Sequence, residues 1–96
     1  SRIDLTYEYQ RAVETYGLSY ADLKQLVRNS IEYSFLPGVS LFEDRGIYAR
    51  TAPSCGKDVL GSDKPSVECA SFIGKSEKAK QQWELERRFQ AFEASL

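Results

Sequence analysis

The sequence predicts an all-α chain of about four helices with one long irregular loop. Three observations lead to this fold class. Apolar residues recur every three or four positions near both ends of the chain, as they do along the buried face of a helix. Serine, aspartate, glycine and proline stand where such helices would begin and end. The stretch between them lacks the sustained alternation of apolar and polar residues that is typical of a half-buried strand.

The first helix is expected from about Leu5 to Tyr16. Asp4 can cap its first turn, because a side-chain oxygen at the N-cap accepts a hydrogen bond from a free backbone N–H. Gly17 can end the helix in the left-handed conformation that is common after a C-terminus. The residues on one face are Leu5, Glu8, Tyr9, Ala12, Val13 and Tyr16.

The second helix, expected between Leu18 and Phe35, is the most fully specified. Ser19 can serve as the N-cap, and Asp22 stands three positions later, as in a capping box. Leu18 and Leu23 have the spacing of a hydrophobic staple. One face carries Leu23, Leu26, Val27, Ser30, Ile31 and Ser34. Because the connection to the first helix is so short, the two helices should form a corner or hairpin.

Pro37 should end the second helix, because proline cannot continue it. Glycine, proline, serine and aspartate then alternate with single apolar residues over 38–64, which predicts a long loop. So long a loop is unusual inside a compact domain, and we expect it to lie against a larger body. Its expected anchors are Leu41, Phe42, Ile47 and Tyr48.

Two further helices are expected after the loop. A short one over 65–73 would begin near Pro65 and end at Gly74, and the last would begin at Ser76. The last helix carries two apolar patches and should therefore contact two neighbours. The patches are Leu85, Phe89, Phe92 and Leu96 on one side, and Ala79 and Trp83 on another. The chain thus divides into a helix pair at 1–37, a loop at 38–64 and tail helices at 65–96.

The composition argues against several classes of function. Thirteen Lys+Arg stand against 14 Asp+Glu, whereas nucleic-acid binders usually present a basic face. The Arg87–Arg88 pair is flanked by glutamates and is interpreted as a solvated helix face. No apolar run is long enough to span a membrane, and no glycine spacing fits a phosphate-binding loop. We therefore expect neither nucleic acid nor membrane as a partner.

Cys55 and Cys69 are the only cysteines of the chain and lie 14 positions apart. As a disulfide they would pin the loop to the short helix, and closing such a loop contributes roughly 3 kcal/mol. A disulfide would favour a bacterial periplasmic or secreted protein over a cytoplasmic one. Free thiols stay open as an alternative. A metal site is disfavoured because two thiolates alone leave zinc undercoordinated, and a catalytic cysteine would lack its usual histidine base.

Other polar groups are interpreted as structural. Asn29 and Ser30 form an amide–hydroxyl pair that should tether the second helix to a loop of a barrel. The paired carboxylates lie in polar segments and should be solvated: Glu43–Asp44, Asp58 with Asp63, and Glu84–Glu86. The early tyrosines should pack at the margin between a helix and a larger partner: Tyr7, Tyr9, Tyr16 and Tyr20. We assign no catalytic, cofactor-binding or metal-binding residue in this chain.

From about Asp4 to Leu36 the chain resembles the adenosine deaminases. In that family a helix of the form L-x-x-E-Y-x-x-A follows the last barrel strand, then a Gly-Leu turn and a helix that ends N-S-[ILF]-x-x-S-F. The residues that match are Leu5, Glu8, Tyr9, Ala12, Gly17, Leu18, Asn29, Ser30, Ile31, Ser34 and Phe35. The later segments LPGVSLFEDRGIYAR and KAKQQWELERRFQAFE look like the tail of bacterial adenosine deaminase-like proteins, some of them exported.

The resemblance implies a zinc-dependent β/α barrel that hydrolyses adenosine to inosine and ammonia. Such a barrel needs about 250 residues, whereas this chain has 96 and contains no histidine to hold zinc. We therefore expect a C-terminal fragment that is inactive alone and needs no cofactor of its own. The zinc ligands and the catalytic glutamate would lie upstream of Ser1, in the missing N-terminal barrel that would be its partner. The lack of methionine also fits a fragment.

Two alternatives remain. The aromatic surplus and the two-patched last helix are also compatible with a stand-alone helical protein-interaction module. A secreted, disulfide-stapled polypeptide resembling a growth factor is a weaker alternative, since one bridge is few for that class.

Overall fold

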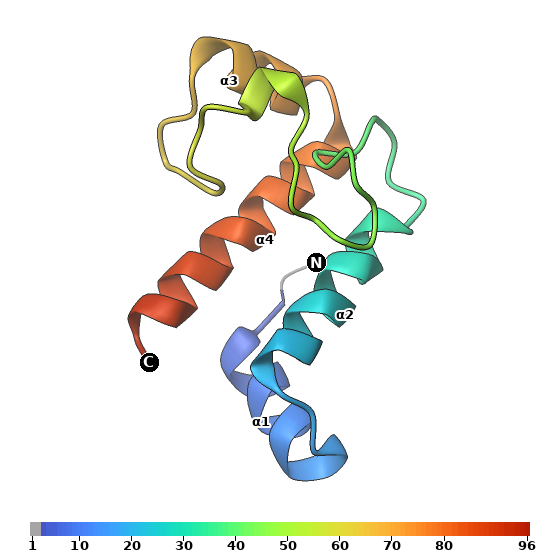
Figure 1. Cartoon of the computed structure of the whole chain (residues 1–96), viewed down its shortest axis with the longest axis vertical. Helices are drawn as coiled ribbons and strands as arrows, with labels where there is room; N and C mark the ends of the chain where they lie inside the picture. The colour runs from blue at the N-terminus through green and yellow to red at the C-terminus, as the bar shows by residue number, and fades with distance from the viewer. Residues whose placement is uncertain (1–2) are drawn as a thin grey trace.

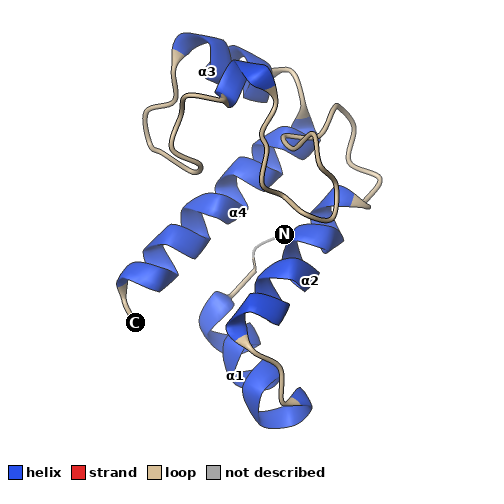
Figure 2. Ribbon diagram, in the orientation of Figure 1, coloured by secondary structure: helices blue, strands red, loops and turns tan. Residues whose placement is uncertain are grey.

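A computed structural model describes residues 3–96 and confirms the all-α prediction. Within this range the only β pairing is an isolated bridge between Phe42 and Thr51. The helices are α1 (Leu5–Tyr16), α2 (Tyr20–Glu32), α3 (Val67–Gly74) and α4 (Glu77–Ala94), with a single 3-10 turn, η1 (Pro53–Cys55) (Figures 1 and 2). The α3 helix and the long loop lie at one end of the molecule and α1 lies at the other (Figure 1).

The α1–α2 hairpin has the predicted local signals. The Asp4 side chain accepts a hydrogen bond of 3.1 Å from the Tyr7 N–H. Gly17 has a left-handed φ of 64°, and its N–H donates to the Val13 carbonyl at 3.2 Å. Ser19 and Asp22 form the complete capping box that begins α2. Three residues therefore separate the two helices, and α1 packs against both α2 and α4.

The prediction that α2 continues to Phe35 is wrong, because the helix ends at Glu32. The Ser34 hydroxyl donates to the Ile31 carbonyl at 2.7 Å and accepts from the Leu36 N–H at 3.4 Å, which holds a turn in place of further helix. The chain must turn here to reach the start of α4. A β-carbon on Gly38 would lie 2.7 Å from Cα of Ser76, so this close approach requires glycine.

Two hydrophobic clusters fill the interior. The loop cluster contains Leu41, Phe42, Tyr48, Cys55, Cys69, Ile73, Ala79 and Trp83. The helix cluster contains Leu5, Ala12, Leu23, Val27, Leu85 and Phe89. Ala79 and Trp83 of α4 belong to the first, whereas Leu85 and Phe89 belong to the second. The expectation that the last helix contacts neighbours through two patches is confirmed, but Leu96, expected in the first patch, is 75% exposed.

The long loop packs against its own chain. Leu41, Phe42 and Tyr48 are buried as predicted, but Ile47 is 74% exposed and the prediction for it is wrong. The carbonyl of Asp44 accepts from the N–H groups of Ile47 and Tyr48, and Tyr48 adopts a positive φ of 61°. This tight turn brings Tyr48 inward and leaves Ile47 at its tip. We expected a larger body to cover these anchors, but Leu41, Phe42 and Tyr48 are already buried within the chain. Only Ile47 is left exposed.

The short turn η1 is not predicted by the sequence pattern, and α3 begins at Val67, two residues later than expected. Ser66 is the N-cap of α3, and its hydroxyl accepts from the Cys69 N–H at 3.3 Å. Asp58 accepts hydrogen bonds from both the N–H and the hydroxyl of Ser66. The same residues that cap α3 thus close the end of the loop.

Cys55 of η1 and Cys69 of α3 form a disulfide in the middle of the loop cluster, with their Cα atoms 4.6 Å apart. Both cysteines are buried. We predict that the double substitution Cys55→Ala and Cys69→Ala lowers stability by roughly 3 kcal/mol, because it releases a loop of this length. The melting temperature should fall by more than about 10 °C.

Hydrogen exchange should locate that loss in the loop and α3, because the helix cluster contains neither cysteine. Ser71→Ala, at an exposed site of α3, is the matched control. Equal melting temperatures for the double variant and the control would contradict the prediction.

Candidate functional site

A groove runs along α2 in the described chain. It consists of two adjoining cavities of about 460 and 410 Å³. Both are lined by Ile3 and Ser30, and we refer to the two together as the α2 groove. Its other apolar lining residues are Ala12, Leu18, Leu23, Leu26, Val27, Ile31 and Leu36. Asp4, Glu8 and Arg11 supply polar groups from the α1 side.

The apolar face that the sequence predicts for α2 is only partly buried. Leu23 and Val27 are buried in the helix cluster, whereas Leu26 is 54% exposed and Ser30 is exposed beside it. The Ser30 hydroxyl donates to the Val27 carbonyl at 2.7 Å. The described chain therefore covers only part of this face, and the hydroxyl on the open part is already hydrogen-bonded.

A row of polar contacts joins another side of α2 to α4. Arg28 donates two hydrogen bonds, of 2.9 and 2.8 Å, to the Glu86 carboxylate. One turn earlier on α2, Lys24 lies 2.8 Å from the carboxylate of Glu93. One turn later, Glu32 accepts a bond of 3.1 Å from Gln82. We call this row the α2–α4 ladder; its partners advance in opposite directions because the two helices are antiparallel.

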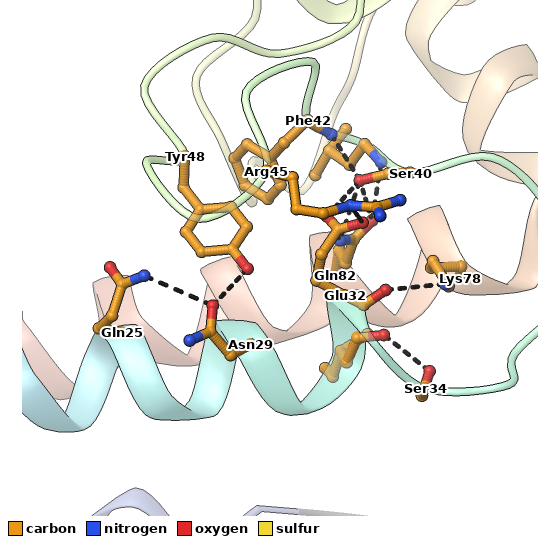
Figure 3. A network of polar contacts seen from close by, with 12 residues as sticks. Gln25, Asn29, Glu32, Ser34, Ser40, Phe42, Arg45, Tyr48, Lys78 and Gln82 are labelled. Carbon is orange, nitrogen blue, oxygen red and sulfur yellow. Dashed lines mark hydrogen bonds and ion pairs between the residues drawn. The ribbon is translucent and has the colours of Figure 1, made fainter.

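Glu32 is the most buried member of the ladder, with a side chain that is 0% exposed. Its Oε1 also accepts a bond of 2.6 Å from the Ser40 hydroxyl, and its Oε2 lies 3.3 Å from Nε of Arg45 (Figure 3). The Lys78 ammonium donates to the Glu32 backbone carbonyl at 2.8 Å. Gln82 in turn accepts from the Leu41 N–H at 2.7 Å. Glu32 thus ties the end of α2 to the loop and to α4.

The contacts of Glu32 indicate a structural role. Carboxylates that act in general acid–base catalysis are commonly paired with a second titratable group, and their environments separate the two pKa values. The Glu32 carboxylate instead faces an arginine, a serine and a glutamine. We therefore assign it no catalytic role.

At the other end of the ladder, Tyr20 and Glu93 have shifted pKa values. Burial raises the pKa of Tyr20, and the hydrogen bond of 2.7 Å that Tyr20 donates to Glu93 raises it further. The hydrogen bond from Lys24 lowers the pKa of Glu93, and the bond from Tyr20 lowers it further. The ammonium of Lys24 also lies 5.0 Å from the centre of the Phe89 ring, which connects the ladder to the helix cluster.

The structure separates the carboxylates that the sequence places in pairs. Asp44 accepts from the Ala49 and Arg50 N–H groups, and Asp58 accepts from the N–H of Ser66, the N-cap of α3. Asp63 and Glu84 both lie 3.6 Å from Arg87, and Glu86 pairs with Arg28. Each of these carboxylates has a positive or backbone partner, and Asp63 and Glu84 share Arg87, so we assign no acid–base pair among them.

Asn29 acts as the tether that its sequence context indicates, although toward the loop of its own chain. Its side-chain oxygen accepts a bond of 2.6 Å from the Tyr48 hydroxyl. Among the early tyrosines, Tyr9 and Tyr20 pack edge to face at 5.9 Å, whereas Tyr7 and Tyr16 are exposed.

Sequence reasoning missed Glu32, Gln82 and Arg45. A usable signal was present, because Lys24, Arg28 and Glu32 are spaced four apart on α2, and Gln82 and Glu86 are spaced four apart on α4. Only the tertiary structure shows that these rows face each other.

The residues present do not fit a zinc site. The chain has no histidine, both cysteines are in the disulfide, and residues 3–96 hold no group of three or more potential metal-ligating side chains. The cysteine pair is compatible with an extracellular location. No helix in this described range is both long and apolar enough to cross a membrane. No model of a known protein family and no solved structure matches the chain.

We predict that Glu32→Ala destabilises the protein by about 2 to 3 kcal/mol, because Ser40 and Gln82 lose a buried acceptor. Glu32→Gln, which keeps an acceptor oxygen, should cost less. Urea unfolding measures both, with Glu14→Ala on the exposed side of α1 as control. If Glu32→Ala is no more destabilising than the control, the role assigned to the cluster is wrong.

The pKa shifts predict stability losses at both ends of the pH range. Glu93 has a lowered pKa, so its contribution is present above its ordinary value of 4.5 and is lost as the pH falls through the folded value. Tyr20 has a raised pKa, so its contribution is present below its ordinary value of 10.0 and is lost as the pH rises toward the folded value.

Urea unfolding across the pH range checks both signs. Glu93→Gln should flatten the acid side of the stability profile, and Tyr20→Phe should flatten the alkaline side. Profiles parallel to that of the wild type would show that these groups do not titrate as inferred.

Proposed function

We propose that this chain is the C-terminal, non-catalytic part of an adenosine deaminase-like zinc hydrolase. The parent would convert adenosine and water to inosine and ammonia, with its zinc and catalytic residues in a β/α barrel upstream of Ser1. The role of this chain would be to close that barrel and cover part of its wall. Since its own residues do not fit zinc, no step of the reaction is assigned to them. The disulfide favours a periplasmic or secreted parent.

The observation that carries this proposal is the partly covered face of α2. A helix in a finished domain normally buries its apolar stripe against its neighbours. In this chain Leu26 remains half exposed above the α2 groove, and Phe35 is fully exposed just beyond the end of α2. An open apolar surface of this kind is typical of a site that contacts another protein body.

The sequence resemblance supports the same proposal. Its first helical motif lies in α1 and the Gly-Leu turn lies in the connection to α2, whereas the second motif begins in α2 and runs into the turn beyond Glu32. Asn29 holds the loop, while its neighbour Ser30 lines the α2 groove. The matched segment therefore contains both the hairpin and its open surface.

A specific observation favours the alternative, a stand-alone helical interaction module. The helix cluster and the α2–α4 ladder join α1, α2 and α4 without help from any other chain. A chain with such a core can unfold cooperatively as a monomer. In that case the α2 groove would bind a separate protein.

The substitution Leu26→Glu separates these possibilities. In the isolated chain it should change stability by no more than about 0.5 kcal/mol, because Leu26 is largely solvated there. In the longer parent it should destabilise by more than about 2 kcal/mol, because it would bury an unpaired charge. Val67→Glu, at an exposed site of α3, should be neutral in both proteins.

Activity provides the second comparison. The parent should deaminate adenosine, and the isolated chain should not. Deamination by the isolated chain would contradict the proposal, as would a Leu26→Glu parent that is as stable as the unmodified one.

A further inference from the structure

The segment 53–75, which contains η1 and α3, has few buried side chains of its own (Figure 1). We call it the η1–α3 unit. Among the helices of residues 3–96, α3 contacts α4 and η1 alone. The buried side chains of η1 and α3 are Cys55, Cys69 and Ile73. Because two of these three are the cysteines, the burial of the unit depends largely on the disulfide between them.

The other contacts that hold the unit to α4 are modest. The Trp83 indole N–H donates to the Ser62 carbonyl at 3.0 Å, and the Gln90 side-chain amide donates to the Leu60 carbonyl. The ion pair between this connection and Arg87 is exposed to solvent. Such hydrogen bonds contribute little net stability, and an exposed ion pair contributes less. A helix of eight residues such as α3 is also too short to persist in water without tertiary contacts.

The rest of the chain is held together without the η1–α3 unit. The helix cluster contains no residue of 53–75. The first part of the loop is tied to α2 by its own hydrogen bonds, of 2.6 Å from the Tyr48 hydroxyl to Asn29 and of 2.6 Å from the Ser40 hydroxyl to Glu32. These bonds involve neither cysteine. The unit can therefore open while the three long helices and the start of the loop stay in place.

We infer that the disulfide is a redox switch that controls whether the η1–α3 unit is folded against α4. In the oxidised state the unit helps to cover Trp83, which is 3% exposed. In the reduced state the unit opens and uncovers Trp83, while α1, α2 and the turn at 43–50 keep their structure. The inference depends on contacts within this chain alone, so it holds with or without the parent of the proposed function.

The switch requires a dithiol reductant, which supplies two electrons and two protons. One reductant thiolate attacks Sγ of a cysteine, which breaks the disulfide and releases the other cysteine as a thiolate that takes up a proton. The second reductant thiolate then displaces the first cysteine, so the products are two protein thiols and the disulfide of the reductant. Both cysteines are buried, so the reductant reaches them only during local opening of the unit.

Treatment of the folded chain with dithiothreitol tests the inference, without denaturant. Alkylation and mass measurement count the free thiols, and hydrogen exchange reports on each segment. Trp83 is the only tryptophan of the chain, so its fluorescence reports on the α4 face beneath the unit. The variant with Cys55→Ala and Cys69→Ala is the matched control. It should resemble the reduced protein and should not respond to dithiothreitol.

We expect two free thiols and an increase of about 100-fold in hydrogen exchange over 53–75, since loss of a cross-link of this length corresponds to roughly that factor. Emission from Trp83 should move to longer wavelength, and exchange in α1 and α2 should not change. Reoxidation with oxidised glutathione should restore the original values.

Three outcomes would overturn the inference. A disulfide that stays oxidised in the folded chain under excess dithiothreitol would show that the unit does not open. Reduction without a change in Trp83 emission or in exchange over 53–75 would show that the disulfide does not control the unit. Equal loss of protection in α1 and α2 would show that the unit is not separate from the helix cluster.

Discussion

The α2–α4 ladder is the constraint on which the rest of the structure depends. Arg28 and Glu86 are charged groups in a largely buried contact, and each is the ion-pair partner of the other. Sliding one helix by a turn would leave a buried charge unpaired, which typically costs several kcal/mol. The ladder therefore sets the register of α2 against α4, although 44 residues separate the end of α2 from the start of α4. Glu32, at its last rung, sets where the loop begins.

That register determines what each side of α2 does. The side with Lys24, Arg28 and Glu32 faces α4, and the adjacent side with Leu23 and Val27 belongs to the helix cluster. The third side is the α2 groove. Because the first two sides are satisfied within the chain, the open side can contact another body without disturbing the hairpin. The disulfide and the loop cluster lie against the N-terminal half of α4, and none of their residues lines the α2 groove. They therefore stabilise the fold without closing the groove.

The local parts of this structure could be predicted from the sequence, and the long-range parts could not. Asp4, Gly17 and Ser19 act on backbone groups only a few positions away, so the bounds of α1 and the start of α2 follow from them. The end of α2 depends on a distant contact between Gly38 and Ser76, and pattern alone placed it too late. The orientation of Ile47 depends on a turn held by Asp44. Periodicity also gave the apolar face of α2 but could not show that the chain leaves part of it uncovered.

The measurement that tests the central claim most directly is the sequence of the source gene upstream of the codon for Ser1. A C-terminal part of an adenosine deaminase-like enzyme requires that the open reading frame continue upstream. It should enter an apolar segment that ends in a pair of acidic residues, with a His-x-His motif far upstream. A start codon or a signal peptide directly before Ser1 would contradict the claim, and the α2 groove would then be the binding surface of a stand-alone helical module.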